Sequence, residues 1–222
     1  MIRLQNLSKT YYLNGRSKVV ARNMNVTFPT GVSVALLGRN GVGKSSLLRM
    51  IAGTMDPDEG NVLSNGTVSW PVGFAGSFHP ELTGAQNVRF VARVYGVDTN
   101  TLVDFVEDFA ELGQHFHLPF RSYSSGMRSR LAFGTSMGIK FDTYLVDEVT
   151  SVGDAAFKQK SEKVFKARMA KSGAIVVSHT TPMLRRMCEA GAVLENGNLR
   201  YFDDVGKAID YYHGVIGNAG DD

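Results

Sequence analysis

A glycine-rich run between two apolar segments constrains this chain more than any other feature. The run is Gly38-Arg39-Asn40-Gly41-Val42-Gly43-Lys44-Ser45. The apolar residues 32–37 before it predict a buried strand, and residues 46–52 after it predict a helix. A strand, a G-x-x-x-x-G-K-S loop and a helix in this order form the pattern of a phosphate-binding loop. The chain is therefore expected to fold as an α/β protein.

The residue types in this loop suit an anionic ligand. Glycines let backbone N–H groups approach phosphate oxygens closely, and a helix N-terminus carries about half a positive charge. We expect Lys44 to neutralise the β- and γ-phosphates, Ser45 to bind Mg²⁺, and Ser46 to lie beside the nucleotide. The alternative is a chance match, which at average residue usage occurs in about one chain in a hundred of this length.

Bulk composition limits the other classes of protein. The chain has 222 residues, of which 43% are hydrophobic, so one large α/β unit can bury a core. The net charge of +3 comes without a dense cationic block, so nucleic acid is not an indicated partner. A single cysteine, Cys188, excludes a disulfide framework. We expect a cytoplasmic protein, because there is no signal peptide and no apolar run near the about 20 residues that span a bilayer.

The rest of the chain alternates between strand and helix patterns. Further strands are predicted at 2–7, 24–28, 143–146 and 174–178, and residues 61–63 and 67–69 predict a small antiparallel pair. Helical spacing at 85–95, 101–112 and 126–139 predicts a helical subdomain over 77–139, inserted into a catalytic core of 1–76 and 140–216. Helices are also expected at 154–171, from Thr181, and at 204–212, before a flexible tail at 217–222. Asn196-Gly197 predicts a hairpin.

Polar residues follow two of the predicted strands. Asp147 and Glu148 come directly after the strand at 144–146. A carboxylate there can hold Mg²⁺, and the next one can polarise an attacking water. His179 ends the strand at 175–178 and would point into the ligand crevice of a doubly wound sheet. A surface carboxylate pair and a buried histidine with satisfied hydrogen bonds are the structural alternatives.

The order and spacing of these motifs resemble the nucleotide-binding subunits of ABC transporters over nearly the whole chain. The resemblance implies a P-loop ABC ATPase core with a small N-terminal antiparallel β region and an inserted helical subdomain. It implies that Glu148 is the catalytic base, Asp147 the metal carboxylate and His179 the γ-phosphate sensor. Tyr11 matches the aromatic residue that stacks on adenine, although a surface tyrosine is the alternative because Tyr12 is adjacent.

The segment before the third helix matches the signature of the same family. Taken alone, its Ser-Ser-Gly is an ordinary helix cap. By resemblance, Ser124, Ser125 and Gly126 bind the γ-phosphate of an ATP that a second copy of the chain holds. Asp154 would be the aspartate that contacts the dimer partner. The implied unit is a homodimer with two ATP and Mg²⁺.

The resemblance narrows to ATPases of capsular polysaccharide exporters, in particular the KpsT type of group 2 capsule systems in Gram-negative bacteria. The blocks that carry it are 69–76, 82–84, 123–133 and 152–155. O-antigen and teichoic acid exporters share the last two blocks and are the main alternative. Several of their ATPases carry an added carbohydrate-binding domain, for which we expect no room here. A soluble ABC ATPase acting on DNA or ribosomes and a P-loop phosphotransferase are weaker alternatives.

This resemblance also implies partners and a location. The ATPase would power export of lipid-linked capsular polysaccharide across the bacterial inner membrane, from its cytoplasmic face. It would contact an integral membrane permease through about residues 74–84. A periplasmic co-polymerase and an outer-membrane export protein would complete the wider complex.

One departure from the family pattern concerns the metal. Most ABC ATPases have a glutamine after the early core that touches both Mg²⁺ and the membrane subunit. Residues 74–81 contain none, and Gln86 falls inside a predicted helix. His79 could take part of that polar role. The alternative is that Phe78 and His79 pack against the membrane partner.

Overall fold

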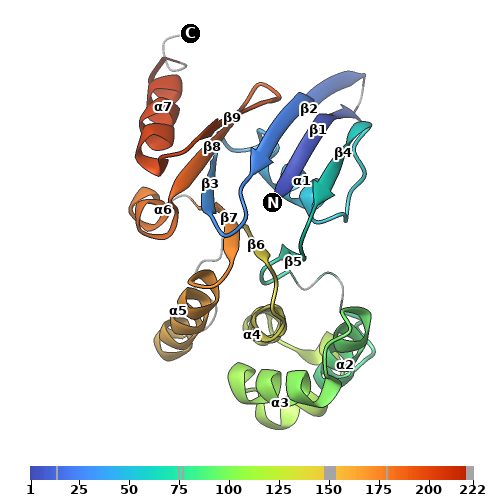
Figure 1. Ribbon diagram of the computed structural model, residues 1–222. Helices are drawn as coiled ribbons and strands as arrows, with labels where there is room; N and C mark the ends of the chain where they lie inside the picture. The colour runs from blue at the N-terminus through green and yellow to red at the C-terminus, as the bar shows by residue number, and fades with distance from the viewer. Residues whose placement is uncertain (14, 75, 77, 148–153, 179, 219–222) are drawn as a thin grey trace. The chain divides into compact units, whose positions relative to one another are not determined.

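The computed structural model describes residues 1–13, 15–74, 76, 78–147, 154–178 and 180–218 (Figure 1). The chain divides into two compact units. Unit 1 comprises Met1–Pro71, Phe141–Glu148 and Lys171–Asp222, and unit 2 comprises Val72–Lys140 and Val149–Ala170. Each is described by itself, and the domain boundaries drawn from the sequence stay a prediction.

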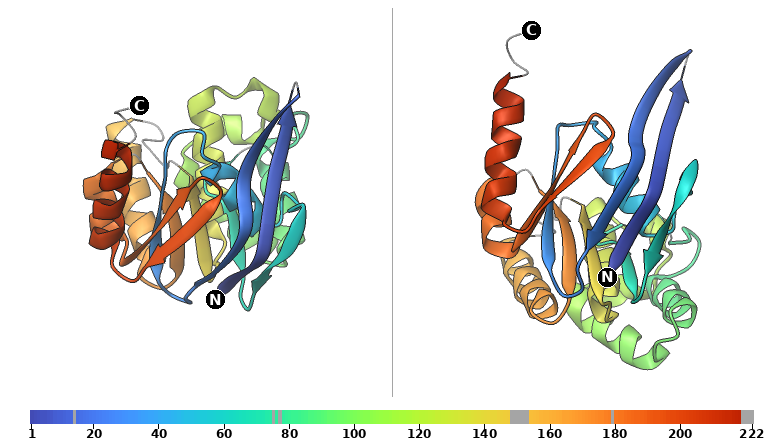
Figure 2. Two further views of the ribbon diagram at one scale, coloured as in Figure 1. Left: turned by 90° about the horizontal axis from the view of Figure 1, so that it is seen from above. Right: turned by 45° about the horizontal axis from the view of Figure 1, so that its top comes forward.

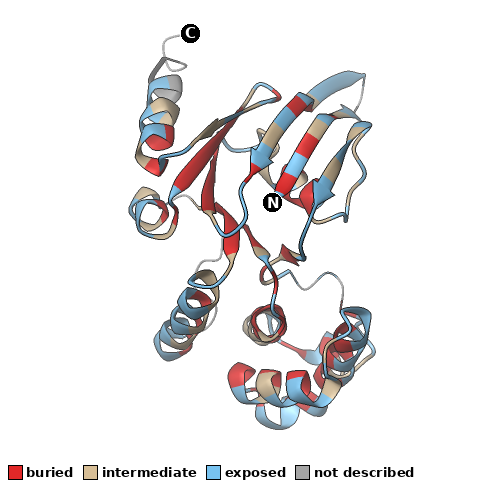
Figure 3. Cartoon of the chain, in the orientation of Figure 1, coloured by how far each residue is buried: buried red, intermediate tan, exposed pale blue. Residues whose placement is uncertain are grey.

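A six-stranded sheet forms the centre of unit 1. Its order is β5 (Val68–Pro71), β6 (Thr143–Asp147), β7 (Gly173–Val177), β3 (Ser33–Leu37), β8 (Ala190–Glu195) and β9 (Asn198–Phe202). All neighbours are parallel except β8 and β9. Every residue of β3 and β7 is buried (Figure 3). Their nearly continuous apolar sequences fit central parallel strands, which are covered on both faces.

A three-stranded antiparallel sheet is the second layer of unit 1. Its order is β2 (Arg16–Phe28), β1 (Ile2–Leu13) and β4 (Glu59–Ser64). In both views of Figure 2, β1 and β2 run side by side as a long ribbon. Both strands are longer than the predicted 2–7 and 24–28. The register shifts along the ribbon, and Asn6 and Asn23 adopt positive φ, so the alternation of apolar residues is interrupted there.

The predicted pair of 61–63 with 67–69 is wrong. β4 pairs with β1, whereas β5 joins the other sheet parallel to β6. The Asp142 carboxylate accepts hydrogen bonds from the Thr67 backbone N–H at 2.7 Å and from the Thr67 hydroxyl at 2.8 Å. These two bonds fix the start of β5 beside β6, a contact over 75 residues that short-range alternation cannot reveal.

The helices of unit 1 are α1 (Lys44–Ile51), α6 (Thr181–Met187) and α7 (Val205–Asn218). The Asn196-Gly197 hairpin is confirmed: both residues have positive φ, 48° and 79°, as a two-residue type I′ turn requires. α7 packs against β8, and its predicted end at 212 is too early. Within the described residues, no helix is long and apolar enough to cross a membrane.

Unit 2 is helical. It contains α2 (Gly84–Val94), α3 (Thr99–Ala110), η1 (Gly113–His117), η2 (Phe120–Ser122), α4 (Ser125–Gly138) and α5 (Ala155–Met169). The ring of Phe109 on α3 lies 5.8 Å from that of Phe133 on α4 and 5.2 Å from that of Phe157 on α5. An aromatic core therefore joins three helices, in agreement with the predicted helical spacing.

Candidate nucleotide site

The phosphate loop ends in a helix that lacks a side-chain cap. The four long helices of unit 2 begin at a side chain that accepts a backbone N–H, namely Thr83, Asp98, Ser124 and Asp154. α1 instead begins after Gly43, which supplies no such acceptor. No side chain at the N-cap accepts from the first N–H groups of α1, so these groups can donate to an anion. The helix dipole favours negative charge at the same place.

Glycine is required at two positions of this loop. Gly43 has a φ of 118°, and a Cβ there would lie 2.3 Å from Cγ1 of Val20. Gly38 has a φ of 155°, and its Cβ would lie 2.6 Å from the carbonyl oxygen of Leu194. β2 and the end of β8 therefore enclose the loop so closely that a side chain at either glycine would displace it.

A cavity of about 510 Å³ opens beside the loop, entirely within unit 1. Its lining residues are Asn40, Gly41, Gly43, Lys44, Ser45, Ser46 and Asp147. They come from two places, the loop with the start of α1 and the carboxyl end of β6. Parallel strands end at one edge of a sheet, which is why Asp147 meets a loop that lies about a hundred residues earlier.

Lys44 places its charge at this loop. Its Nζ donates to the carbonyl oxygens of Gly38 at 2.7 Å and Arg39 at 3.1 Å. The ammonium group is therefore held beside the cavity that Lys44 itself lines. A cation in this position fits the binding of phosphate oxygens.

Two oxygen-bearing side chains in the cavity fit a magnesium ion. Ser45 and Asp147 both line it, and Mg²⁺ prefers oxygen ligands, of which a protein supplies few. In the described part of the chain, no group of three His, Cys, Asp or Glu side chains could hold a metal ion. The predicted catalytic residues Glu148 and His179 lie outside the described residues.

Tyr11 is attached to α1, whereas its neighbour projects into solvent. The Tyr11 hydroxyl lies 3.2 Å from Oγ of Ser46 and donates to Sδ of Met55 at 3.1 Å. Tyr12 is 81% exposed, against 38% for Tyr11. Of the two tyrosines, Tyr11 is the one beside the phosphate loop, and stacking on adenine stays a prediction for it.

The predicted signature residues begin α4 in unit 2. Ser124 is the N-cap and accepts from the Met127 backbone N–H at 3.3 Å, and Ser125 and Gly126 form the first turn. Tyr123 just before them is buried, and its hydroxyl donates to the carbonyl oxygen of His115 at 2.6 Å. Burial raises the pKa of Tyr123 to about 12, so the hydroxyl stays protonated as a donor. The start of the signature is thus anchored to η1.

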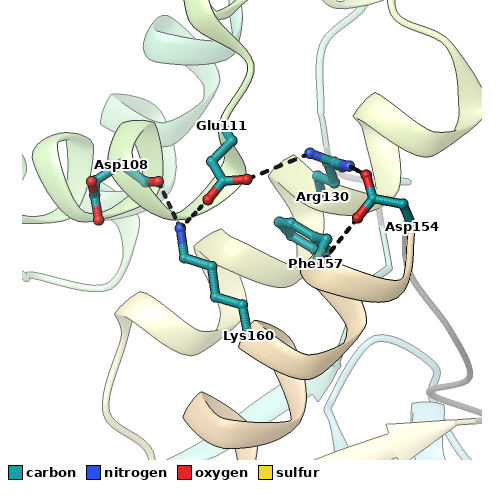
Figure 4. Close-up of polar contacts among 6 residues, drawn as sticks. All are labelled: Asp108, Glu111, Arg130, Asp154, Phe157 and Lys160. Atoms are coloured by element: carbon teal, nitrogen blue, oxygen red, sulfur yellow. Dashed lines mark hydrogen bonds and ion pairs between the residues drawn. The ribbon is translucent and has the colours of Figure 1, made fainter.

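Asp154 is held by its own chain (Figure 4). Its carboxylate accepts from the Phe157 backbone N–H at 2.9 Å and pairs with the Arg130 guanidinium at 2.9 Å. The Phe157 hydrogen bond, and then the positive charge of Arg130, hold the pKa of Asp154 below its ordinary value. The guanidinium also lies 4.4 Å from the centre of the Phe157 ring. The predicted dimer contact of Asp154 stays a prediction.

The same network continues to α3, and no pattern in the sequence predicted it. Glu111 pairs with Arg130 at 3.9 Å and with Lys160 at 2.7 Å, and Lys160 also donates to the Asp108 carbonyl oxygen at 3.0 Å. Glu111 ends α3 with a left-handed φ of 52°. Alternating charges thus join α3, α4 and α5.

Asn87 on α2 holds the segment that was predicted to contact a membrane subunit. Its side chain is buried, accepts from the His79 backbone N–H at 2.8 Å, and donates to the carbonyl oxygens of His79, Leu82 and Thr83. Sequence reasoning missed this residue, although an amide on the apolar face of a helix was a usable signal. Gln86 is confirmed to lie in α2, where its side chain completes a capping box with Thr83. A metal role for His79 stays a prediction.

Comparison with known proteins decides the family. The family model for "ABC transporter" matches residues 21–151. This chain belongs to the ABC transporter family. The polysialic acid transport ATP-binding protein KpsT of Escherichia coli is 48% identical over 96% of each chain. The ATP-binding protein BexA of Haemophilus influenzae is 41% identical over 96% of this chain and 98% of its own length.

A solved structure shows the same fold. The dimeric, post-hydrolysis structure of the ATP-binding cassette MJ0796 with ADP and phosphate has a TM-score of 0.73 and 22% identity. The matched region covers 90% of this chain and 97% of the MJ0796 chain. The predicted ABC ATPase fold is confirmed, and the chain is an ATPase of the ABC type.

Proposed function

We propose that this ABC ATPase binds ATP with Mg²⁺ in the phosphate-loop cavity and powers export of lipid-linked capsular polysaccharide. The observation that carries the proposal is the cavity, where Lys44, Ser45 and Asp147 meet beside the uncapped start of α1. The relatives supply the substrate class. KpsT is named for polysialic acid transport, and CtrD of Neisseria meningitidis, 39% identical, for capsule polysaccharide export.

Other polymers are less well supported. Relatives named for O-antigen export and for teichoic acid export are 34% and 32% identical, below the 48% of KpsT. The difference favours a capsular polymer over these two alternatives.

The predicted site residues have the following roles in this proposal. Lys44 and the first N–H groups of α1 bind the phosphates, and Tyr11 holds the adenine. Ser45 and Asp147 would hold Mg²⁺, which neutralises charge on the phosphates when bound. Glu148 orients and polarises the attacking water, and His179 contacts the γ-phosphate.

The proposal includes a homodimer. The chain has one phosphate loop in unit 1 and one Ser-Ser-Gly signature in unit 2, and the signature of one copy would complete the ATP site of the other. MJ0796, with the same fold, has been solved as a dimer. ATP binding closes such a dimer and hydrolysis reopens it, because ATP has a higher affinity for the closed state.

A membrane-spanning permease is the proposed partner of unit 2. Asn87 hydrogen-bonds to His79, Leu82 and Thr83, so residues 79–83 are attached to α2 and can form a contact surface. Phe74, Phe90 and Val94 expose apolar side chains in the same unit, which suits a protein partner. The ATPase would thus work at the cytoplasmic face of the inner membrane, with a periplasmic co-polymerase and an outer-membrane export protein beyond it.

Two variants test this function. Lys44→Ala should lose ATP affinity in calorimetry, because the phosphates lose their cation. Glu148→Gln should keep ATP affinity, lose turnover, and fail to restore surface polysaccharide in cells that lack the wild-type gene. Lys163→Ala, on the exposed side of α5, is the matched control and should restore it. Normal capsule in cells that carry only Glu148→Gln would refute the proposal.

A further inference from the structure

The β1–β2 ribbon brings a second lysine to the phosphate loop. Nζ of Lys18 on β2 lies 3.5 Å from the position that a Cβ of Gly41 would take, and Gly41 lines the cavity. Lys18 lies outside the G-x-x-x-x-G-K-S motif, twenty residues before Gly38, so the motif gives no indication of it.

The register of the ribbon explains this position. Lys18 is directly opposite Tyr11 in the antiparallel ladder, and directly opposed residues place their side chains on one face. The Tyr11 hydroxyl contacts Ser46 on α1, and Val20, two residues after Lys18, lies against Gly43. One face of the ribbon therefore carries Tyr11, Lys18 and Val20 along the loop and the start of α1.

The charge of Lys18 is available for a ligand. In the part of the chain that the structure describes, no carboxylate lies within ion-pair distance of its ammonium. Lys9 on the same ribbon differs, because Asp58 pairs with it at 2.7 Å. An exposed lysine with no counter-ion among the described residues, near a helix start that has no side-chain cap, strengthens the positive potential at the loop.

We propose that Lys18 is a second phosphate-binding cation of the nucleotide site. Its ammonium contacts the phosphate oxygens from the side of β2, and Lys44 contacts them from the loop. Tyr11, directly opposite Lys18, holds the base, so the ribbon binds the nucleotide at both ends. This inference rests on the proposed binding of ATP in the cavity.

Competition binding to the full chain tests the inference. ATP and inorganic tripolyphosphate displace a fluorescent ATP analogue from the wild type and from Lys18→Met, Lys18→Arg, Tyr11→Ala and Lys163→Met. Lys18→Met should weaken both competitors about three- to fivefold, the effect of one partly solvated charge contact. The loss should shrink in about 1 M salt, where charges are screened within about 3 Å. Lys18→Arg should retain most of the affinity.

The two controls separate a phosphate contact from a structural effect. Tyr11→Ala should weaken ATP and leave tripolyphosphate unchanged, and Lys163→Met should change neither. Equal tripolyphosphate affinity of the wild type and Lys18→Met would overturn the role of Lys18 and leave ATP binding intact. A wild type that binds no nucleotide would instead refute the proposed function itself.

Discussion

Replacing Asn87 by leucine removes the buried amide that holds residues 79–83 against α2. Leucine has the same branched shape and the same number of side-chain heavy atoms, so the change deletes hydrogen bonds without opening a cavity. The three carbonyl oxygens that Asn87 contacts each keep a backbone donor: Leu82 N–H for His79, Phe120 N–H for Leu82, and Asn87 N–H for Thr83. The His79 N–H, by contrast, loses the acceptor that lies 2.8 Å away.

The expected loss of stability follows from this difference between the three carbonyl oxygens and the His79 N–H. A donor left without a partner costs about 1–3 kcal/mol, and each lost bond to a carbonyl that keeps another donor costs about 0.5 kcal/mol. Asn87→Leu should therefore lower the free energy of unfolding by about 2.5–4.5 kcal/mol. For a chain of this length, 1 kcal/mol corresponds to about 2–4 °C, so the melting temperature should fall by about 5–18 °C.

Thermal unfolding followed by circular dichroism measures this shift. Arg89→Ala is the matched control, since Arg89 lies on the exposed side of α2 two residues later, and its effect should stay within about 0.5 kcal/mol. Equal melting temperatures of Asn87→Leu and Arg89→Ala would show that the amide does not hold this segment.

Two further changes test unit 1. Gly43→Ala should lower the free energy of unfolding by about 2–4 kcal/mol, since its φ of 118° and the 2.3 Å approach to Val20 both oppose a side chain. Adding Val20→Ala should recover only part of this loss. Full recovery, measured by urea unfolding, would show that the φ of residue 43 causes no strain. Hydrogen bonds from Thr67 hold the pKa of Asp142 below 3.8, so its stabilising effect is present above that pH and is lost as the pH falls through the lowered pKa. The melting temperature of Asp142→Asn should therefore fall less between about pH 5 and about pH 3 than that of the wild type, and parallel curves would contradict this role.

Much of the fold was predictable because its signals are local. The apolar run at 32–37, the helical spacing at 101–112 and the Asn196-Gly197 turn each determine their own element. β5 was misassigned because its partner is decided by Asp142, far along the chain. Local patterns indicate that a strand forms, but long-range hydrogen bonds decide which strand it pairs with.

The candidate site likewise contains residues that local sequence patterns predict and residues that they do not. The phosphate loop and Asp147 follow from motif and strand end, and the structure places them around one cavity. The roles of Lys18 and Asn87 do not follow from local sequence patterns. Cross-strand register brings Lys18 to the loop, and tertiary packing buries Asn87. Exposed charges such as Glu111 carry no sequence signal of their pairing.

The proposed function requires that ATP join two copies of this chain. Sedimentation of Glu148→Gln with and without ATP and Mg²⁺ tests it most directly, since this variant should bind ATP and not consume it. We expect a mass of 24.2 kDa without nucleotide and about twice that mass with one ATP bound for each chain. A species that stays at 24.2 kDa while saturated with ATP would contradict it.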